Sequence, residues 1–315
     1  MSFSQAAKNE ICRITKEGRE CRIAELSALI KTGGTLRING QHSVSFRIST
    51  ENPAIARRIF SLIKDCFGVH PQVMVKKSRQ LMKNNIYLVI VSSGSETINI
   101  LKECGILSLT GKRIKIIYGI KHSIIKDSES KKAYIRGAFL GGGSLTNPEK
   151  TYHLEFVNHT REHARSLSKI INSFGLSSKV IQRKSNYVVY IKEGEQIVDL
   201  LNIIGAHRSL LNLENVRIYK EMRNNVNRLV NCETANLNKT VNASVRQIEN
   251  IKLIGRTIGI KKLPRNLSEI AEARLNHPDC SLKELGEMLD PPIGKSGVNH
   301  RLRKIEEIAE ELMNK

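Results

Sequence analysis

The 315-residue sequence has no tryptophan, and aromatic residues make up only 4% of it. Hydrophobic residues nevertheless account for 40% and charged residues for 26%, a balance that is typical of globular proteins and not of disordered ones. The cores must therefore be built from Ile, Leu and Val. A chain of this length has room for two or three domains of ordinary size.

Long apolar runs are also absent. No run approaches the roughly eighteen residues that a membrane-spanning helix needs, so we expect no membrane partner. The N-terminus lacks the pattern of a secretory signal, because Met1 leads into Ser2-Phe-Ser-Gln5 and then into a charged, helix-like stretch. We therefore expect the protein to stay in the cytoplasm.

Metal-binding cysteine pairs are missing as well. The six cysteines include no C-x-x-C pair, and the two nearest, Cys12 and Cys21, are nine residues apart. This spacing fits neither a zinc module nor a redox pair. We therefore expect isolated, reduced cysteines in or near the cores, and neither a metal nor another cofactor.

Acidic residues are too few to balance the basic ones. The formal net charge is +21 and the isoelectric point is near 9.9, which indicates a polyanionic partner, most often nucleic acid. A basic surface that only keeps the protein soluble is the alternative. Residues 206–315 hold 19 Lys and Arg against 14 Asp and Glu, which leaves 32 against 16 for residues 1–205. Most of the positive surplus therefore lies in the first two thirds of the chain.

The first two hundred residues contain an internal repeat. Leu26–Leu36 aligns with Ile135–Leu145: each is a short apolar helical run that ends in a glycine pair, followed by Thr or Ser and then Leu. The alternating segments Val44–Ile48 and His153–Val157 follow as expected strands. This self-similarity predicts two copies of one structural unit.

Each copy continues in the same order. Asn52 and Thr160 are expected to cap the next helix, and Gly68 and Gly175 to end it. Two strands and a closing helix then follow, near 73–77, 86–91 and 96–104 in the first copy and near 179–183, 187–192 and 195–204 in the second. The predicted order is α-β-β-α-β-β-α, twice, joined by a polar and basic link over 109–130.

Helical patterns replace strand alternation after Ala206. We expect a helix over 213–229, a polar linker over 231–240 and a new helix over 241–254. A basic stretch punctuated by glycine then leads into the last fifty residues.

Those last fifty residues carry the pattern of a helix-turn-helix. Asn266 with Glu269, and Ser281 with Glu284, are expected to form capping boxes that open the first two helices. Gly286 supplies the small residue that the second helix needs where the third one crosses it. Two prolines at 291 and 292 force a turn, and the third helix is expected from near 296 to 312.

The third helix has a graded polar face. Residues 295–304 include basic residues and no acids, while four glutamates lie between 306 and 311. A recognition helix contacts bases with its N-terminal part, so insertion into the major groove predicts this gradient. An ordinary amphipathic helix is the alternative. The candidate DNA-binding residues are Lys295, Ser296, Asn299, His300, Arg301, Arg303 and Lys304.

The repeat over residues 21–205 resembles the LAGLIDADG homing endonuclease family in its single-chain form with two pseudo-symmetric halves. The resemblance implies that two signature helices pack side by side, with Ala28 and Gly137 as the small residues that permit close approach. It also implies two four-stranded sheets that form a saddle over duplex DNA. Basic residues that could lie on this saddle are Arg47, Lys76, Lys77, Arg79, Lys179, Arg183, Lys184 and Lys192.

Cleavage in that family needs an acidic residue at the end of each signature helix, because the carboxylates hold divalent metals. The matching positions here are Gly33 and Gly142, which offer no carboxylate. We therefore expect no catalytic residue, no metal and no enzyme activity. Two alternatives stay open: an active endonuclease or RNA maturase, and a saddle that binds a regulatory protein while only the helix-turn-helix binds DNA.

A degenerate double LAGLIDADG region followed by a helix-turn-helix resembles the WhiA family of Gram-positive bacteria, and Asn227–Asn236 and Gly294–Leu302 look like its signatures. The fold class expected is α+β, a pseudo-symmetric αββαββα saddle in two halves followed by an all-α helix-turn-helix domain. The resemblance implies a transcription regulator of cell division, chromosome segregation or sporulation, bound to double-stranded promoter DNA at the nucleoid. The expected domains are 1–20 (N-terminal helical segment), 21–108 and 131–205 (the repeats), 109–130 (basic linker), 206–262 (helical connector) and 263–315 (helix-turn-helix).

Overall fold

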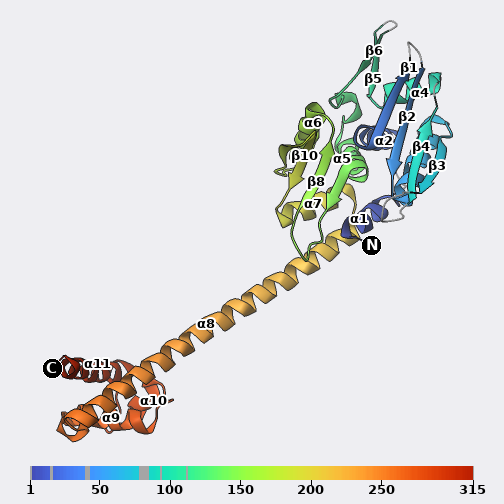
Figure 1. Ribbon diagram of the computed structural model, residues 1–315. Coiled ribbons are helices and arrows are strands. Elements are labelled where there is room, and N and C mark those ends of the chain that lie inside the picture. The colour runs from blue at the N-terminus through green and yellow to red at the C-terminus, as the bar shows by residue number, and fades with distance from the viewer. Residues whose placement is uncertain are drawn as a thin grey trace. The chain divides into compact units, whose positions relative to one another are not determined.

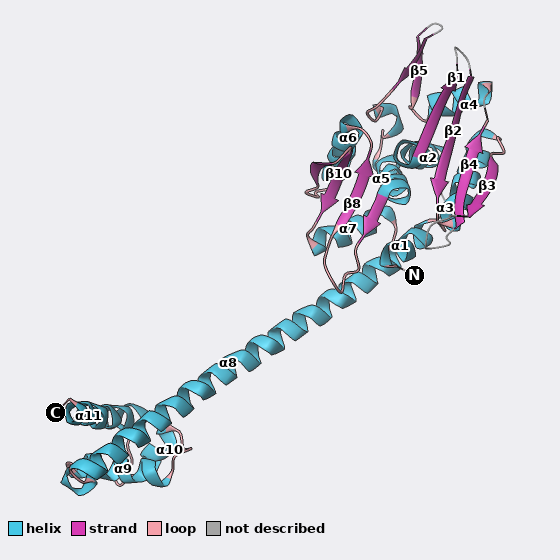
Figure 2. Ribbon diagram, in the orientation of Figure 1, coloured by secondary structure: helices cyan, strands magenta, loops and turns pink. Residues whose placement is uncertain are grey.

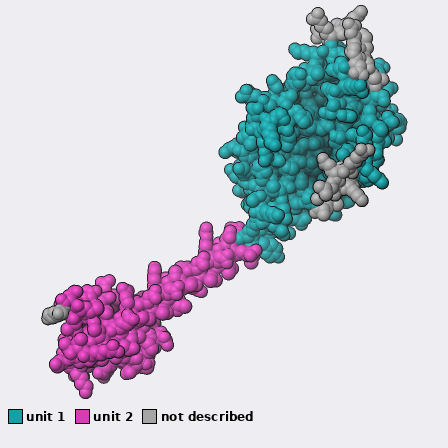
Figure 3. All heavy atoms as spheres, in the orientation of Figure 1, with its two compact units in different colours: residues 1–220 teal, residues 221–315 magenta. Residues whose placement is uncertain are grey.

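The computed structural model describes residues 2–14, 17–39, 43–77, 85–92, 94–110 and 113–314. The chain divides into two compact units, Met1–Lys220 and Glu221–Lys315 (Figure 3). Within the described ranges, no helix combines the length and the apolar character needed to cross a membrane. The candidate residue Arg79 lies outside the described residues.

The first unit contains the two predicted repeats, and each has the predicted order of elements (Figures 1 and 2). The chain starts with α1 (Phe3–Ile11). The first repeat consists of α2 (Arg19–Gly33), β1 (Gly34–Asn39), β2 (Ser43–Thr50), α3 (Pro53–Phe67), β3 (Gln72–Lys77), β4 (Asn85–Val91) and α4 (Ser95–Glu103). The second consists of α5 (Ser128–Gly142), β7 (Gly143–Leu145), β8 (Leu154–Asn158), α6 (Arg161–Asn172), β9 (Lys179–Arg183), β10 (Asn186–Ile191) and α7 (Gly194–Ile204).

Both repeats form a four-stranded antiparallel sheet with the same strand order. The orders are β1-β2-β4-β3 and β7-β8-β10-β9, which are identical once the strands are numbered within each repeat. Between the repeats lie a short hairpin of β5 (Leu107–Thr110) and β6 (Arg113–Ile116) and a 3-10 turn, η1 (His122–Ile124). The hairpin begins two residues before the predicted link.

Local capping explains where the helices after the second strands begin. The Asn52 side chain accepts a hydrogen bond from Ala54 N at 2.8 Å, and Pro53 opens α3 with a backbone angle that suits a helix. Gly68 ends α3 in the left-handed conformation, as predicted. Thr160 caps α6 as predicted, but the C-cap of α6 is Ser173, so the prediction of Gly175 as its cap is wrong. Gly175 is left-handed two residues later, where the chain leaves the helix end.

The core of the first unit is centred on α2 and α5, which lie side by side between the two sheets (Figure 1). A Cβ on Gly137 would lie 2.2 Å from Glu25 O and 2.9 Å from Ala28 Cβ. These separations are far below van der Waals contact, so only glycine fits against α2 at this point. The predicted roles of Ala28 and Gly137 in close helix packing are therefore confirmed.

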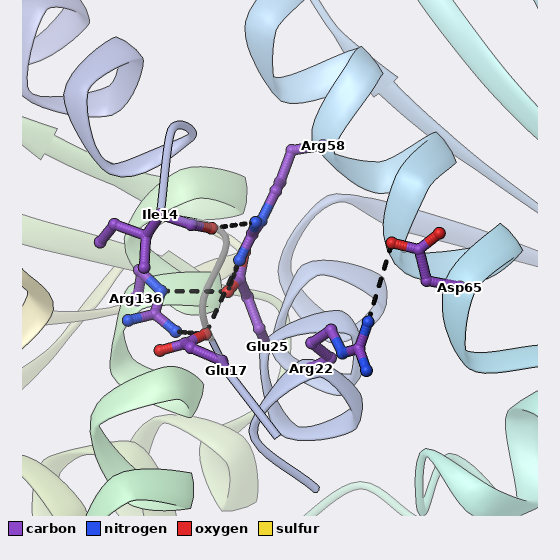
Figure 4. A network of polar contacts seen from close by, with 7 residues as sticks. All are labelled: Ile14, Glu17, Arg22, Glu25, Arg58, Asp65 and Arg136. Atoms are coloured by element: carbon purple, nitrogen blue, oxygen red, sulfur yellow. Dashed lines mark hydrogen bonds and ion pairs between the residues drawn. The ribbon is translucent and has the colours of Figure 1, made fainter. Parts of the chain in front are cut away.

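A network of buried charges joins α2 to its two neighbouring helices (Figure 4). Glu25 is completely buried, and both of its carboxylate oxygens accept hydrogen bonds from Arg58 of α3 at 2.8 Å. Arg136 of α5 donates to the same carboxylate at 3.0 Å. Glu17 forms ion pairs with both arginines. One carboxylate thus holds two guanidinium groups that come from different repeats.

The second repeat buries a neutral polar pair instead. Tyr134 of α5 and His163 of α6 are almost fully buried, and a hydrogen bond of 2.8 Å joins Tyr134 Oη to His163 Nε2. Burial, reinforced by the charges of Lys31 and His159, lowers the pKa of His163 from 6.5 to about 3. The imidazole is therefore neutral in the folded protein at any pH near neutrality.

We expect the first unit to lose stability on acidification because of His163. The unfolded chain binds this proton below pH 6.5, whereas the folded chain excludes it until about pH 3, so the contribution is complete above pH 6.5 and is lost as the pH falls. Urea unfolding should show a loss of ~2 kcal/mol from this residue between pH 7 and pH 5. His163→Asn should remove this part of the pH dependence, whereas His70→Asn, at an exposed histidine, should leave it unchanged.

A single long helix occupies the region for which we predicted a linker. The polar linker over 231–240 is wrong, because α8 runs without interruption from His207 to Thr257. No proline or glycine occurs between residues 207 and 254. Asn and Thr are weak helix formers that each cost less than about 0.7 kcal/mol, so they do not break a helix as Pro does. Glu10 of α1 anchors its start by accepting hydrogen bonds from Arg208 N and Ser209 N at 2.6 and 3.0 Å.

The second unit is helical. After η2 (Ile260–Lys262), it contains α9 (Arg265–Asn276), α10 (Leu282–Glu287) and α11 (Lys295–Met313). The buried residues that form its core, beginning on the last turns of α8, are Ile251, Ile254, Leu263, Leu267, Ile270, Ala271, Leu285, Leu289, Val298, Leu302, Ile305 and Ala309. The three predicted helices of the helix-turn-helix are therefore confirmed.

The two predicted capping boxes of this unit differ in outcome. Ser281 and Glu284 form the complete reciprocal box at the start of α10. The box at Asn266 is wrong, because the N-cap of α9 is Pro264, two residues earlier, and no side chain caps the helix. The ring of Pro264 fixes its φ at a value that suits the residue directly before a helix, so the helix begins earlier than predicted, at Arg265. Glu269 pairs instead with Arg265 at 2.9 Å.

Candidate nucleic-acid interface

The turn between α10 and α11 packs directly on α10. A Cβ on Gly286 would lie 2.1 Å from Ile293 O and 3.1 Å from a methyl group of Val298. The two backbones are also joined by a hydrogen bond of 3.0 Å from Ile293 N to Gly286 O. Gly286 therefore has the predicted role: it lets the turn and the start of α11 approach α10 at backbone distance.

The orientation of α11 follows from its apolar stripe. Val298, Leu302, Ile305 and Ala309 are buried against α9 and α10. Helical spacing places Ser296, His300 and Arg303 on the opposite side, with Asn299 and Lys304 beside them. All five of these residues, together with Lys295, are exposed.

Arg301 is the exception among the seven candidates on α11. It is half-buried and donates a hydrogen bond to Asn266 O, at the start of α9, at 3.3 Å. This contact gives Arg301 a role in holding α11 to α9. Arg301 lies three residues after Val298 and four before Ile305, and this helical spacing beside the apolar stripe was the signal in the sequence that could have separated it from the others.

The charges of α11 run against the helix dipole. Helices favour acidic residues near the N-terminus and basic residues near the C-terminus, by about 0.3–1 kcal/mol for each charge. In α11 the first turn contains no acidic residue and the last turn no basic one, while Lys295 opens the helix and four glutamates lie near its end. Stability alone does not account for this order, whereas attraction of a phosphate backbone to the first half does.

Strand register separates the candidate residues of the saddle into two faces. Val89 and Val189 are fully buried under the helices, and they pair with Val73 and Val180. Alternation then places four candidates on the sheet faces turned away from the helices: Arg47, Lys76, Lys179 and Arg183. Lys77 has the parity of Val73 and points to the helix side. Lys184 lies in the β9–β10 turn with a positive φ of 55°.

The outward sheet faces are not uniformly basic. Glu155 of β8 lies 3.6 Å from Arg183 and 3.2 Å from His153. Met74 and Ile181 are more than two-fifths exposed on the same faces. These faces therefore combine basic, acidic and apolar side chains, unlike the first half of α11.

Neither signature helix ends in a carboxylate, and at one of the two ends a side chain would also clash with the backbone. A Cβ on Gly142 would lie 2.7 Å from Val157 O and 3.3 Å from Thr32 Cβ. At Gly33 the nearest atoms are 3.5 Å or more away, and they include the backbone of Gly141. Across the described part of the chain, no group of three or more His, Cys, Asp or Glu residues is placed to hold a metal ion.

Three family models together match most of the chain. The WhiA N-terminal LAGLIDADG-like domain matches residues 19–107, the WhiA LAGLIDADG-like domain matches 131–223 and the WhiA C-terminal HTH domain matches 226–309.

Individual relatives match nearly the full length. The chain is 62% identical to a "Probable cell division protein WhiA" of Clostridium novyi, over 99% of this chain and 98% of the relative. A protein of the same name from Clostridium beijerinckii is 63% identical over 99% of both chains. Among solved structures, full-length DUF199/WhiA from Thermatoga maritima is 28% identical with a TM-score of 0.60, over 99% of both chains. The chain therefore belongs to the WhiA family, with two LAGLIDADG-like halves followed by a helical helix-turn-helix domain.

Proposed function

We propose that this protein is a non-catalytic regulator that binds duplex DNA selectively through α11. The observation that carries this proposal is the exposed row of Ser296, His300 and Arg303 opposite the buried stripe of α11. This row lies in the N-terminal half of the helix, where recognition helices contact bases, and its side chains are suited to base edges.

The saddle contributes affinity without sequence selection. Arg47, Lys76, Lys179 and Arg183 lie on the outward sheet faces, where they can neutralise phosphates. Lys77 and Lys184 contribute less in this proposal, because neither lies on those faces. The Lys and Arg surplus of residues 1–205 supports this division of roles.

The cellular role proposed is transcription regulation in cell division, with chromosome segregation or sporulation as linked processes. The printed name of the clostridial relatives, "Probable cell division protein WhiA", supports the first of these. A protein that binds promoter DNA in a bacterium would act in the cytoplasm, at the nucleoid.

Absence of nuclease activity is part of the proposal. Gly33 and Gly142 supply no carboxylate for a metal, and the backbone of β8 leaves no space for a side chain at Gly142. Supercoiled plasmid incubated with the protein and Mg²⁺ or Mn²⁺ should therefore stay intact. Metal-dependent nicking would support the endonuclease alternative.

Arg303→Ala should weaken binding of the full-length protein to its operator duplex by about ten-fold, because a bidentate arginine–guanine contact contributes ~1–3 kcal/mol. Binding to an unrelated duplex should change much less. Fluorescence anisotropy on both duplexes measures the two affinities, and their ratio gives the selectivity. The matched control is Arg256→Ala, at an exposed arginine on α8. Equal losses on the two duplexes would reduce Arg303 to a phosphate contact and contradict base recognition at this position.

A saddle that binds a protein instead of DNA is the second candidate, which the exposed Met74 and Ile181 favour. Replacing Arg47, Lys76 and Arg183 together by alanine decides between the two. If the saddle contacts DNA, the slope of log affinity against log salt concentration falls by about two to three. An unchanged slope favours the protein partner.

A further inference from the structure

A polar pocket of about 660 Å³ lies between α1, α2 and α3, in the first unit. We call it the arginine pocket. Its charged lining residues are Arg13, Arg22, Glu51, Arg57, Arg58 and Asp65. None of these residues belongs to the outward sheet faces or to α11. The pocket has a volume that is ordinary for small-molecule sites.

The four guanidinium groups of the pocket differ in how far their charges are satisfied. Arg58 is fully engaged by Glu25 and Glu17. Arg22 lies 3.8 Å from Asp65, and its Nε is buried with no hydrogen-bond partner among the described atoms. Arg13 and Arg57 are exposed and form no ion pair within the described residues. The pocket therefore has positive charge and donors available for an anion.

An apolar pocket of about 470 Å³ adjoins the arginine pocket along α3. It shares Pro53, Arg57 and Ser61 with the arginine pocket. Its other lining residues are Ala56, Phe60, Val73, Val75 and Tyr87. Val73 and Val75 are 45% and 56% exposed, a large apolar exposure for two neighbouring strand positions.

We propose that the two pockets together bind a nucleotide, with its phosphates on Arg13, Arg22 and Arg57 and its base on the apolar side. Guanidinium groups match phosphate oxygens in a bidentate geometry. Aromatic side chains such as Phe60 and Tyr87 offer faces on which a base stacks. Arg57 lies at the boundary of the two pockets, where the phosphates meet the sugar.

Isothermal titration calorimetry tests this site, with ATP and inorganic tripolyphosphate as probes. The full-length protein is titrated without DNA and at constant ionic strength. Both should bind, and ATP should bind about ten-fold more tightly because only ATP reaches the apolar pocket. Replacing Arg13 and Arg57 together by alanine should weaken both probes by about ten-fold or more. Arg165→Ala, at an exposed arginine on α6, is the matched control and should have no effect.

A second pair of variants separates the apolar side from general attraction to a basic protein. Val73→Ser should weaken ATP by about five-fold and leave tripolyphosphate unchanged. Val180→Ser is its control, because Val180 has the equivalent place in the second sheet and is 36% exposed. The proposal is overturned if ATP or tripolyphosphate does not bind. It is also overturned by binding that Arg13 and Arg57 do not affect, or that Arg165→Ala weakens equally.

Discussion

Replacing Glu25 with alanine should lower the free energy of unfolding of the first unit by about 3–5 kcal/mol. The substitution leaves Arg58 and Arg136, both almost fully buried, without the carboxylate that accepts three hydrogen bonds from them. Glu17 pairs with both arginines but is partly exposed, so its single carboxylate balances only part of their two positive charges. Leaving an almost fully buried guanidinium without its carboxylate is among the costliest changes that a single mutation makes.

Thermal unfolding followed by circular dichroism measures this loss. A change of 3–5 kcal/mol corresponds to a fall in the midpoint of roughly 6–20 °C for a unit of this size. Glu20→Ala is the matched control, because Glu20 is an exposed glutamate of the same helix that reaches Lys126 only at 3.9 Å. If the Glu25→Ala and Glu20→Ala proteins unfold at the same temperature, the buried network does not stabilise the fold.

The Glu25 network also shows where prediction from the sequence ends. The caps at Asn52 and Ser281 and the apolar stripe of α11 depend on residues within about a turn of their neighbours, and the repeat was predictable because the same local pattern occurs twice. Glu25 finds Arg58 33 residues away and Arg136 111 residues away. No local pattern distinguishes such a glutamate from a solvated one, so its role emerges only from the packing of three helices.

The failures at α8 and α9 have a different cause. The segment 231–240 is polar, and polarity was taken to indicate a linker, but Asn and Thr cost a helix little. No proline or glycine, the residues that disfavour a helix most, occurs between residues 207 and 254. At α9 the start is set by the backbone of Pro264, while Asn266 has the side chain of a cap but lies inside the helix. At α8 the absence of proline and glycine, and at α9 the backbone of Pro264, mattered more than the polarity of the side chains.

The candidate interface, like the fold, was predictable only where local spacing decides it. The face of α11 followed from spacing, and six of its seven candidates are exposed. Arg301 stays a predicted DNA contact, but it also packs against the start of α9, and charge alone does not show which arginines contact a neighbouring helix. On the saddle, a shift of one residue along β3 separates Lys76 from Lys77, and only the register with β4 shows which side each one faces.

Gly286→Val should unfold the helix-turn-helix and abolish selective DNA binding while the first unit stays folded. A Cβ at this position would lie 2.1 Å from the carbonyl oxygen of Ile293, and this oxygen belongs to a backbone that is already hydrogen-bonded to Gly286. The turn cannot retreat without moving Val298 and the start of α11. We expect a loss of ~3 kcal/mol or more in the second unit, at the upper end of the range for overpacked cores.

Gly297→Ala provides the matched control within the same motif. The nearest atom to a Cβ at Gly297 is a side-chain carbon of Ile293 at 3.5 Å, an ordinary contact. Alanine there should stabilise α11 by about 0.5–1 kcal/mol, because glycine is the costlier residue inside a helix. Calorimetry of the two full-length variants, with anisotropy on the operator duplex for Gly286→Val, gives opposite shifts if crowding at Gly286 sets the geometry of the motif. A Gly286→Val protein that still unfolds at the wild-type temperature and selects its operator would show that the turn adapts, and that the position of α11 does not depend on this contact.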